Sequence, residues 1–278
     1  MKAAYTLCQN RLSGLIKAII LIIIIFNINI ATPQELSTLS NNHVVDSTKS
    51  SKYNFRKYAP YAIAGAIGVG VFAFDKSLNE FSQKSKYHSA GADDFSDALD
   101  DYGQFGPYII IGPLLAGYGL AFDNDYCLRT SGELLAGLVA AELVTGGAKL
   151  TLGRKRPHET DDAYDFFKGG HSFWSGHTIA VFTFATIVSK RFSRQNLSFI
   201  GIDHNFPIVP ILAYSYAGLV GIQRLYANDH WASDVYFGAI AGYAIGTITV
   251  HLSDKLKSGK LKLKTGRHVY LIYELPIS

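Results

Sequence analysis

The sequence predicts an all-α fold, a bundle of helices that lies in or against a membrane. Of the 278 residues, 48% are hydrophobic and only 17% are charged, which is too apolar for an ordinary soluble domain of this length. Apolar stretches of roughly 12 to 18 residues recur along the chain, and stretches of this length favour helices over strands. The 26 glycines would let helix backbones approach one another closely.

Charge and cysteine content exclude several classes of protein. The net charge of +4 gives no dense basic stripe, so no nucleic-acid partner is expected. The two cysteines, Cys8 and Cys127, can form neither a disulfide framework nor a cysteine metal site.

Residues 1–31 have the pattern of a signal peptide or signal anchor. Basic residues precede an apolar run, Ala18–Phe26. Because this run is shorter than the roughly 20 residues that span a bilayer, a removable signal is favoured over an anchor. Residues 32–57 are rich in Ser, Asn and Lys and lack periodicity, so we interpret them as a polar linker.

Residues 58–252 hold the predicted bundle. The expected helices are Tyr58–Phe74, Pro107–Phe122, Leu134–Leu150, Thr178–Ser189, Ile208–Ile222 and Val235–Leu252. Each is marginal in length for a membrane span, so a soluble bundle of apolar helices is the alternative. Residues 253–278 form a basic C-terminal tail, in which His268–Leu275 has the composition of a strand.

A polar loop, Asp75–Gln104, is expected between the first two bundle helices. It carries an acidic cluster of five residues, Asp93, Asp94, Asp97, Asp100 and Asp101. Their spacing matches no calcium-binding EF-hand, so we interpret them as a solvated helix face.

Three connections between bundle helices carry residues that suit an anion. In the first, Lys149 closes a helix that Gly153 can end. Pro157 favours an extended conformation for Arg156, so the cations of Lys149 and Arg156 can bend toward one point. A lone lysine at a helix end would be an ordinary cation that pairs with the helix dipole. An anion site is favoured only because Lys149 and Arg156 occur together.

The second connection runs through Ser175, Gly176 and His177 into the stretch that begins at Thr178. Ser175 is a good N-cap, and a helix N-terminus presents free N–H groups and a positive dipole end. Gly176 removes a side chain that would keep an anion away. Taken alone, this pattern is also that of an ordinary cap with a surface histidine.

The third connection contains Arg224, His230 and Asp234 and leads into the last bundle helix. If that helix begins near His230, Asp234 lies one turn on. Its carboxylate can then bond one ring nitrogen of His230 and leave the other free as a nucleophile. Taken alone, a histidine and an aspartate at this spacing are more often a solvated pair.

Together the connections resemble the motifs of the type 2 phosphatidic acid phosphatase family, which shares its helical fold and site with bacterial class A acid phosphatases and vanadium haloperoxidases. The first motif, Lys-x6-Arg-Pro, is matched by Lys149, Arg156 and Pro157. The second, Pro-Ser-Gly-His, is matched at Ser175, Gly176 and His177. The third, Ser-Arg-x5-His-x3-Asp, is matched at Arg224, His230 and Asp234. The chain departs from the family pattern at Trp174, where proline is usual, and at Gln223, in the place of the serine.

The resemblance implies a role for each matched residue. His230 attacks phosphorus to give a phosphohistidine, His177 protonates the leaving alcohol and then activates water, and Asp234 holds His230 in the productive tautomer. The phosphate-binding residues are Lys149, Arg156, Ser175, Gly176 and Arg224. Three cations suit the charge of a phosphoryl-transfer transition state, so no metal or other cofactor is expected.

Basic residues predict the orientation of the bundle. Lys190, Arg191 and Arg194 lie in a loop opposite the motifs, and the tail adds further lysines. By the positive-inside rule this end faces the cytoplasm, so we expect a bacterial-type inner-membrane protein with an extracytoplasmic site. A cleaved signal followed by six crossing helices would invert that orientation. At least one stretch is therefore expected not to cross, or else the domain is soluble in the periplasm.

The leading function is a metal-independent phosphatase that hydrolyses a phosphomonoester or diphosphate, with a phosphorylated lipid and the membrane as partners. The alternatives are a vanadium-dependent haloperoxidase, a soluble periplasmic acid phosphatase and a catalytically silent membrane protein. Vanadium binding with halide oxidation would identify the haloperoxidase. The sequence names neither the substrate nor a protein partner.

Overall fold

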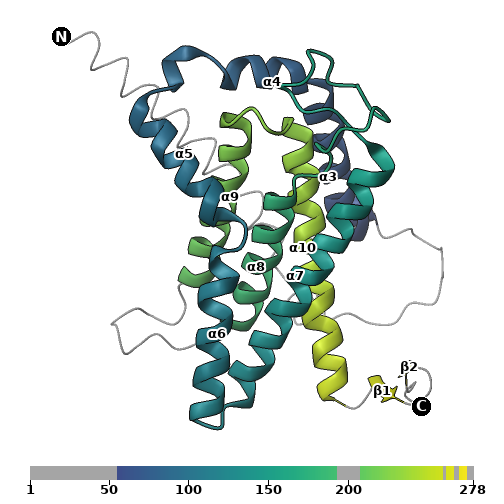
Figure 1. Ribbon diagram of the computed structural model, residues 1–278. Helices are drawn as coiled ribbons and strands as arrows, with labels where there is room; N and C mark the ends of the chain where they lie inside the picture. The colour runs from purple at the N-terminus through teal and green to yellow at the C-terminus, as the bar shows by residue number, and fades with distance from the viewer. Residues whose placement is uncertain (1–54, 193–206, 259–260, 266–268, 274–278) are drawn as a thin grey trace, which may run out of the picture. The chain divides into compact units, whose positions relative to one another are not determined.

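Figure 1 shows the computed structural model, which describes residues 55–192, 207–258, 261–265 and 269–273. The predicted signal segment and linker lie outside these residues, apart from the last three positions of the linker. The chain divides into two compact units, Met1–Gly70 and Val71–Ser278. In the first unit the described part is most of helix α3 (Phe55–Ala73), which is apolar and exposes Tyr61 and Val69.

The second unit holds the remaining elements. They are α4 (Asp75–Ser82), the 3-10 helix η1 (Ser85–Tyr87), α5 (Ala90–Gly103), α6 (Gly106–Ala121), α7 (Asp125–Leu152), α8 (Gly176–Phe192), α9 (Ile208–Tyr226), α10 (Ala232–Lys257), β1 (Leu261–Thr265) and β2 (Val269–Tyr273). Each predicted apolar stretch is a helix, which confirms the helical bundle. The strands form an antiparallel hairpin in which Leu261 faces Tyr273, and β2 lies in the segment of strand-like composition.

Helix α8 is the centre of the bundle. It packs against α7, α9 and α10, and most of its side chains are buried. This explains why its sequence is apolar on all sides. A core cluster joins it to α6, α7 and α10 through Tyr108, Leu134, Ala180, Phe184, Ile187 and Val250. The Tyr108 hydroxyl donates to the Ala180 carbonyl at 2.8 Å, so the polar atom in this core is satisfied.

A stripe of glycines brings α10 against α8. Gly238, Gly242 and Gly246 lie one helical turn apart and face α8. A Cβ atom added at Gly242 would lie 2.5 Å from the Ile179 carbonyl oxygen, and one at Gly246 would lie 2.7 Å from the Thr186 Cβ. The two backbones are therefore closer than any other residue type would allow.

The expectation of a polar loop over Asp75–Gln104 is wrong, because most of this segment is helical. Ser89 caps α5 by accepting the Ala92 N–H. On α5, Gly103 lies against Val220 of α9. Each helix in this segment is short and half polar, since it covers one end of the bundle and does not run through its core. It therefore lacks the continuous apolar stretch that revealed the other helices.

Three helices are long and apolar enough to cross a membrane: α7, α9 and α10. Counting Tyr58–Ala73 and Asp75–Ser82 as one broken span gives up to four among the described residues. Large apolar side chains on α6 and α7 are exposed, among them Ile109, Leu120, Leu135 and Leu143. Contact with lipid would cover such a surface, so the bundle has the character of a membrane protein.

At the end of the bundle away from the motifs, Arg191 of α8 is buried. Its Nε and Nη2 atoms donate to the two carboxylate oxygens of Glu133 at 2.7 and 2.6 Å, and Nη2 also donates to Asp254 at 2.9 Å. The charge of Arg191, which the orientation argument counted as a loop cation, is therefore paired inside the bundle.

Candidate active site

The predicted site residues lie at one end of the second unit, at the top of Figure 1. Lys149 is in the last turn of α7, and His177 is in the first turn of α8. Arg224 is in the last turn of α9, and Asp234 is in the first turn of α10. Neighbouring antiparallel helices therefore bring the three connections together.

The segment after α7 turns sharply at Gly153. This residue has a left-handed φ of 48° and its N–H bonds to the Lys149 carbonyl, as expected of a glycine that ends a helix. Gly170 lies so close to this turn that an added Cβ would stand 2.2 Å from the Arg154 carbonyl oxygen. Arg154 then points into the protein and is fully buried, whereas Arg156 stays partly exposed.

The start of α8 lies beside Lys149. Ser175 is fully buried, and its Oγ accepts the Thr178 N–H at 3.4 Å and the Thr178 hydroxyl at 2.9 Å. A Cβ atom on Gly176 would lie 3.8 Å from the Lys149 Nζ. Since the Ser175 oxygen caps the helix, the groups that α8 offers an anion are the N–H groups of its first turn.

Arg224 is 3% exposed and is held on three sides. Its Nε donates to the Gln223 Oε1 at 2.5 Å, and Nη1 donates to Asp229 at 3.2 Å. The Gln223 amide donates in turn to Ser96 of α5 at 3.0 Å. Gln223, which departs from the family pattern, thus holds the Arg224 guanidinium and ties it to α5.

Two carboxylates lie among the predicted phosphate-binding groups. Asp100 of α5 accepts a hydrogen bond from the Arg224 Nη2, and the same oxygen is 3.2 Å from the His177 Nε2. Asp229 joins Arg224 to Arg156, whose Nη1 donates to it at 3.1 Å. Sequence reasoning missed the contacts of both residues. The interpretation of the acidic cluster as a solvated helix face holds for the exposed Asp93, Asp94, Asp97 and Asp101, whereas Asp100 points to the predicted site.

His230 is 2% exposed and stands just before α10. Its Nδ1 is 3.7 Å from the Asp234 Oδ2, an ion-pair distance that is too long for a hydrogen bond. Among the described residues, this Nδ1 has no hydrogen-bond partner. Burial lowers the pKa of His230, Asp234 opposes this, and the charges of Arg156 and Lys149 lower it further. The ring is therefore neutral near pH 7, the form in which a histidine is a nucleophile.

His177 is perturbed in the same direction. Burial, and then the charge of Arg224, lower its pKa to about 4, while Asp100 opposes the shift. A bound phosphate would bring negative charge beside this ring and raise its pKa. His177 can thus take up a proton when an anion enters the site.

Sequence reasoning also missed Arg154, which lies between the matched positions of the first motif. Its guanidinium donates to Asp234 at 2.5 Å and to Asp75 at 2.7 Å. In the described part of the chain, no three His, Cys, Asp or Glu side chains are grouped so that they could hold a metal ion.

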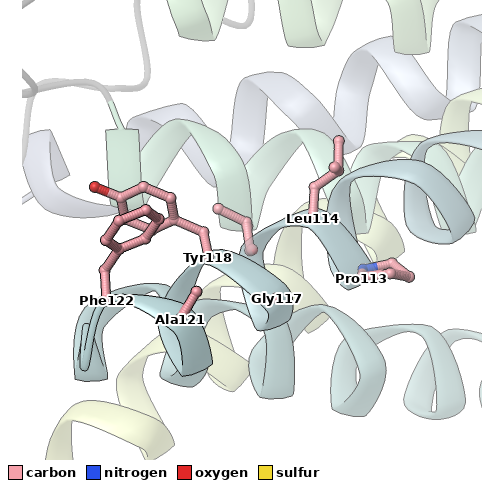
Figure 2. Close-up of a pocket in the computed structure, with 7 residues that line it drawn as sticks. Pro113, Leu114, Gly117, Tyr118, Ala121 and Phe122 are labelled. Atoms are coloured by element: carbon pink, nitrogen blue, oxygen red, sulfur yellow. The ribbon is translucent and has the colours of Figure 1, made fainter.

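Figure 2 shows a hollow of about 600 Å³ along α6 that is separate from these residues. It is apolar, and it is lined by Pro113, Leu114, Leu115, Gly117, Tyr118, Ala121 and Phe122. None of the lining residues belongs to a motif. The groups that suit an anion lie at the other end of the bundle.

The described residues thus form a helical bundle that brings the three motifs to one end. Residues 131–258 match the model of the PAP2 superfamily. The matched residues include all three motifs, so the resemblance seen in the sequence is confirmed.

Individual relatives are distant. The chain is 25% identical over 210 residues to the lipid A 1-phosphatase of Porphyromonas gingivalis, a match that covers 74% of this chain and 40% of the relative. The chain thus spans well under half the length of that protein. A transmembrane PAP2-type phosphatidylglycerolphosphate phosphatase from Bacillus subtilis is 20% identical, covers 72% of this chain and 98% of that one, and has a TM-score of 0.52. This likeness shows a shared fold. LpxE of Aquifex aeolicus is 21% identical over 64% of this chain and 95% of that one, with a TM-score of 0.47.

Proposed function

We propose that this protein is a phosphoric ester hydrolase of the PAP2 type, which removes phosphate from a phosphorylated lipid through a phosphohistidine intermediate. One observation carries the proposal: three cations and two histidines, from the ends of four helices and the segments beside them, lie near the N-terminus of α8. Asp229 bridges Arg156 and Arg224, and Asp100 bridges Arg224 and His177. Side chains linked through shared carboxylates are close enough to bind one phosphate group.

In this mechanism the cations hold the equatorial oxygens of the phosphoryl group. Arg156 and Arg224 each offer a planar fork for two oxygens, and Lys149 acts as a point charge. The first-turn N–H groups of α8 add neutral donors. Such preorganised charge stabilises the negative charge of the transition state.

The chemistry takes two steps. First, the Nε2 of His230 attacks phosphorus, a P–N bond forms, the P–O bond to the lipid breaks, and His177 gives its proton to the leaving oxygen. Then His177 takes a proton from water, the resulting hydroxide attacks phosphorus, and the P–N bond breaks to release phosphate and free His230. The negative charge of Asp234, whose Oδ2 lies 3.7 Å from Nδ1 of His230, favours the tautomer with the proton on Nδ1, so Nε2 stays available.

The lipid nature of the substrate is supported by two observations. The Porphyromonas gingivalis relative is a lipid A 1-phosphatase, so the phosphate it removes is borne by a lipid. The exposed apolar side chains of α6 and α7 suit a bundle whose active end takes its substrate from a membrane surface. We propose a phosphomonoester or diphosphate of a lipid as the substrate class.

We expect His230→Ala to abolish turnover, because the variant lacks the proposed nucleophile. His177→Ala should slow substrates with poor leaving groups most. The assay is phosphate release in detergent from phosphatidate, phosphatidylglycerophosphate, lipid A, isoprenyl diphosphates and soluble phosphomonoesters, with rapid-quench trapping of the phosphoenzyme. His251→Ala is the control, since His251 is an exposed histidine near the far end of α10. An acid-labile phosphoenzyme that persists in His230→Ala would remove this residue from the nucleophile's role.

We also propose that the site faces the extracytoplasmic side of a bacterial-type inner membrane, which the basic tail supports. Glu159 and Ser258 are exposed; Glu159 lies in the segment that follows α7 at the motif end, and Ser258 follows the last residue of α10 at the other end. In a background without Cys8 and Cys127, an impermeant thiol reagent on intact cells should label Glu159→Cys and spare Ser258→Cys. Labelling of both would indicate a soluble periplasmic domain, and labelling of Ser258→Cys alone would invert the orientation.

A further inference from the structure

Arg154 cannot bind phosphate, because every donor of its guanidinium is used inside the protein. The side chain is 0% exposed. Nε and Nη2 donate to the Ala163 carbonyl at 3.0 and 2.6 Å, and Nη2 also donates to the Asp75 Oδ2 at 2.7 Å. Nη1 donates to the Ser233 Oγ at 2.8 Å and to the Asp234 Oδ1 at 2.5 Å. A guanidinium has five N–H donors, and these bonds use them all.

Asp75 is the second carboxylate on this guanidinium, and it anchors the start of α10. Its Oδ1 accepts the Ser233 N–H at 2.8 Å, and its Oδ2 accepts the Ser233 hydroxyl at 2.5 Å. Ser233 is in the first turn of α10, where N–H groups lack a helical partner. Asp75 thus fixes the helix end that follows His230 and carries Asp234.

Aromatic rings enclose the same guanidinium. Its central carbon is 5.4 Å from the ring centre of Phe72, 4.9 Å from that of Phe166 and 5.4 Å from that of Trp231. The rings exclude water and favour a cation over their faces. Breaking an ion pair in such buried surroundings costs much free energy. The carboxylates of Asp75 and Asp234 are therefore held against the Arg154 guanidinium.

Asp234 therefore has one available orientation. Its Oδ1 is bound to Arg154, and its Oδ2 accepts the Ser172 hydroxyl at 2.5 Å and the Trp231 N–H at 2.9 Å. The same Oδ2 faces the Nδ1 of His230 at 3.7 Å. We infer that Arg154, Asp75 and Ser172 are positioning residues that hold the Asp234 carboxylate against Nδ1 of His230 and thereby select the tautomer with Nε2 free.

The inference rests on the proposed function for its catalytic meaning, but the tautomer can be observed without turnover. Histidine labelled with 15N reports which ring nitrogen carries the proton, and the His230 signals are those missing from His230→Ala. In the wild-type chain, in detergent micelles, we expect Nδ1 to be protonated and Nε2 bare. Ser172→Ala removes one donor from the Asp234 Oδ2, and Arg154→Lys cannot bind Asp75, Asp234 and Ala163 together. Both variants should give a mixture of tautomers.

A matched control is Ser189→Ala. Ser189 is also a buried serine, and it lies on α8 about 20 Å along the helix from Gly176 at 1.5 Å per residue. This variant makes the same chemical change at a similar burial and should leave the His230 signals unchanged. Arg154→Lys tests the centre of the cluster, and Ser172→Ala keeps the test possible if the lysine variant does not fold.

Kinetics give a second readout that a merely structural role would not move. Ser172→Ala should lower kcat about tenfold with KM unchanged, since a hydrogen bond to a charged group is lost away from the phosphate. In an Asp234→Asn background the same change should cost less than twofold, because Ser172 acts through that carboxylate. An equal loss in both backgrounds would indicate general damage and overturn the inference.

The two proposals fail separately. Unchanged His230 signals in both Ser172→Ala and Arg154→Lys overturn the positioning role, whatever the activity. A disturbance of equal size in Ser189→Ala does the same. If the wild-type chain releases no phosphate from any lipid while the His230 tautomer responds as expected, the positioning role stands and the proposed function falls.

Discussion

Each end of the bundle has a buried arginine whose two carboxylate partners can be compared. Arg191 lies between Glu133 and Asp254, and Arg154 lies between Asp75 and Asp234. Asp254 is half exposed, and within the described part of the chain its carboxylate pairs with Arg191 and Arg129 alone. At the motif end, Asp234 also contacts Ser172 and Trp231, and its Oδ2 faces Nδ1 of His230.

This difference shows that a buried ion pair is not by itself a sign of function. Each pair fixes helices to one another, and removing one partner of either would leave a buried charge without compensation. The two ion pairs differ in the residues that their carboxylates contact next. Glu133 pairs with Arg129 and Arg191, whereas Asp234 lies between Arg154 and the histidine of the third motif.

The largest expected effect comes from replacing each of the two arginines by methionine, which tests whether the two ends differ in function. Both Arg154→Met and Arg191→Met should lower the free energy of unfolding in detergent by about 3–5 kcal/mol. At a temperature where both variants remain folded, Arg191→Met should keep the wild-type kcat, whereas Arg154→Met should lose at least about tenfold. Equal losses of kcat would make the two ends equivalent and contradict the distinction.

The loss of folding stability at acidic pH should also come from the motif end. The pKa of His177 is about 4 in the folded protein and near 6.5 in the unfolded chain, and that of His230 is lowered too. Between these values the unfolded chain binds more protons than the folded protein. The contribution of these histidines to the free energy of unfolding is therefore fully present above about pH 6.5, and it is lost as the pH decreases toward 4. The slope is about 1.4 kcal/mol per pH unit for His177, and His230 contributes in the same direction.

Unfolding in denaturant at pH 7, 6 and 5 measures this slope. His177→Gln should reduce it, whereas His251→Gln at the far end should not. A slope that is the same in both variants would show that the acid sensitivity does not come from the site.

The smallest expected effect concerns Asp100, which contacts Arg224 and His177 where a phosphate would bind. Asp100→Asn removes a competing negative charge, so the inhibition constant for vanadate, a mimic of the transition state, should fall about two- to fivefold. The effect is modest because Asp100 is 45% exposed. Asp94→Asn, on the exposed part of the same helix, is the control. Weaker inhibition in Asp100→Asn would mean that this carboxylate assists binding.

Much of the fold follows from the sequence because long apolar stretches leave few options. Each of the six stretches is a helix, although α7 begins at Asp125, nine residues before the expected Leu134. That first part carries Arg129, Ser131 and Glu133, which interrupt the apolar pattern. Their polar atoms pair with Asp254, the Gly112 carbonyl and Arg191, partners that lie on other helices and are invisible to a local pattern.

The same limit explains what sequence reasoning missed at the site. The motif residues could be named because their spacing is that of a family. Arg154 stands in a run of basic residues and looks like a surface cation, since its partners Asp75 and Ser233 are each 79 positions away. Asp100 and Ser172 are likewise defined by the groups they meet in space, and their neighbours in the sequence give no sign of it.

The glycine stripe between α8 and α10 sets a dimension of the site. His177 is carried by the start of α8 and His230 by the residues that lead into α10, so the separation of the two histidines depends on how closely these helices pack. Gly238, at the top of the stripe, would place an added Cβ 3.2 Å from the Ser175 carbonyl, in the segment that carries His177. Any larger residue at these three positions would push the helices apart and increase the separation of the two histidines. These three glycines thus set the distance between α8 and α10 at the site. Exposed apolar residues elsewhere on the bundle can change without altering that distance.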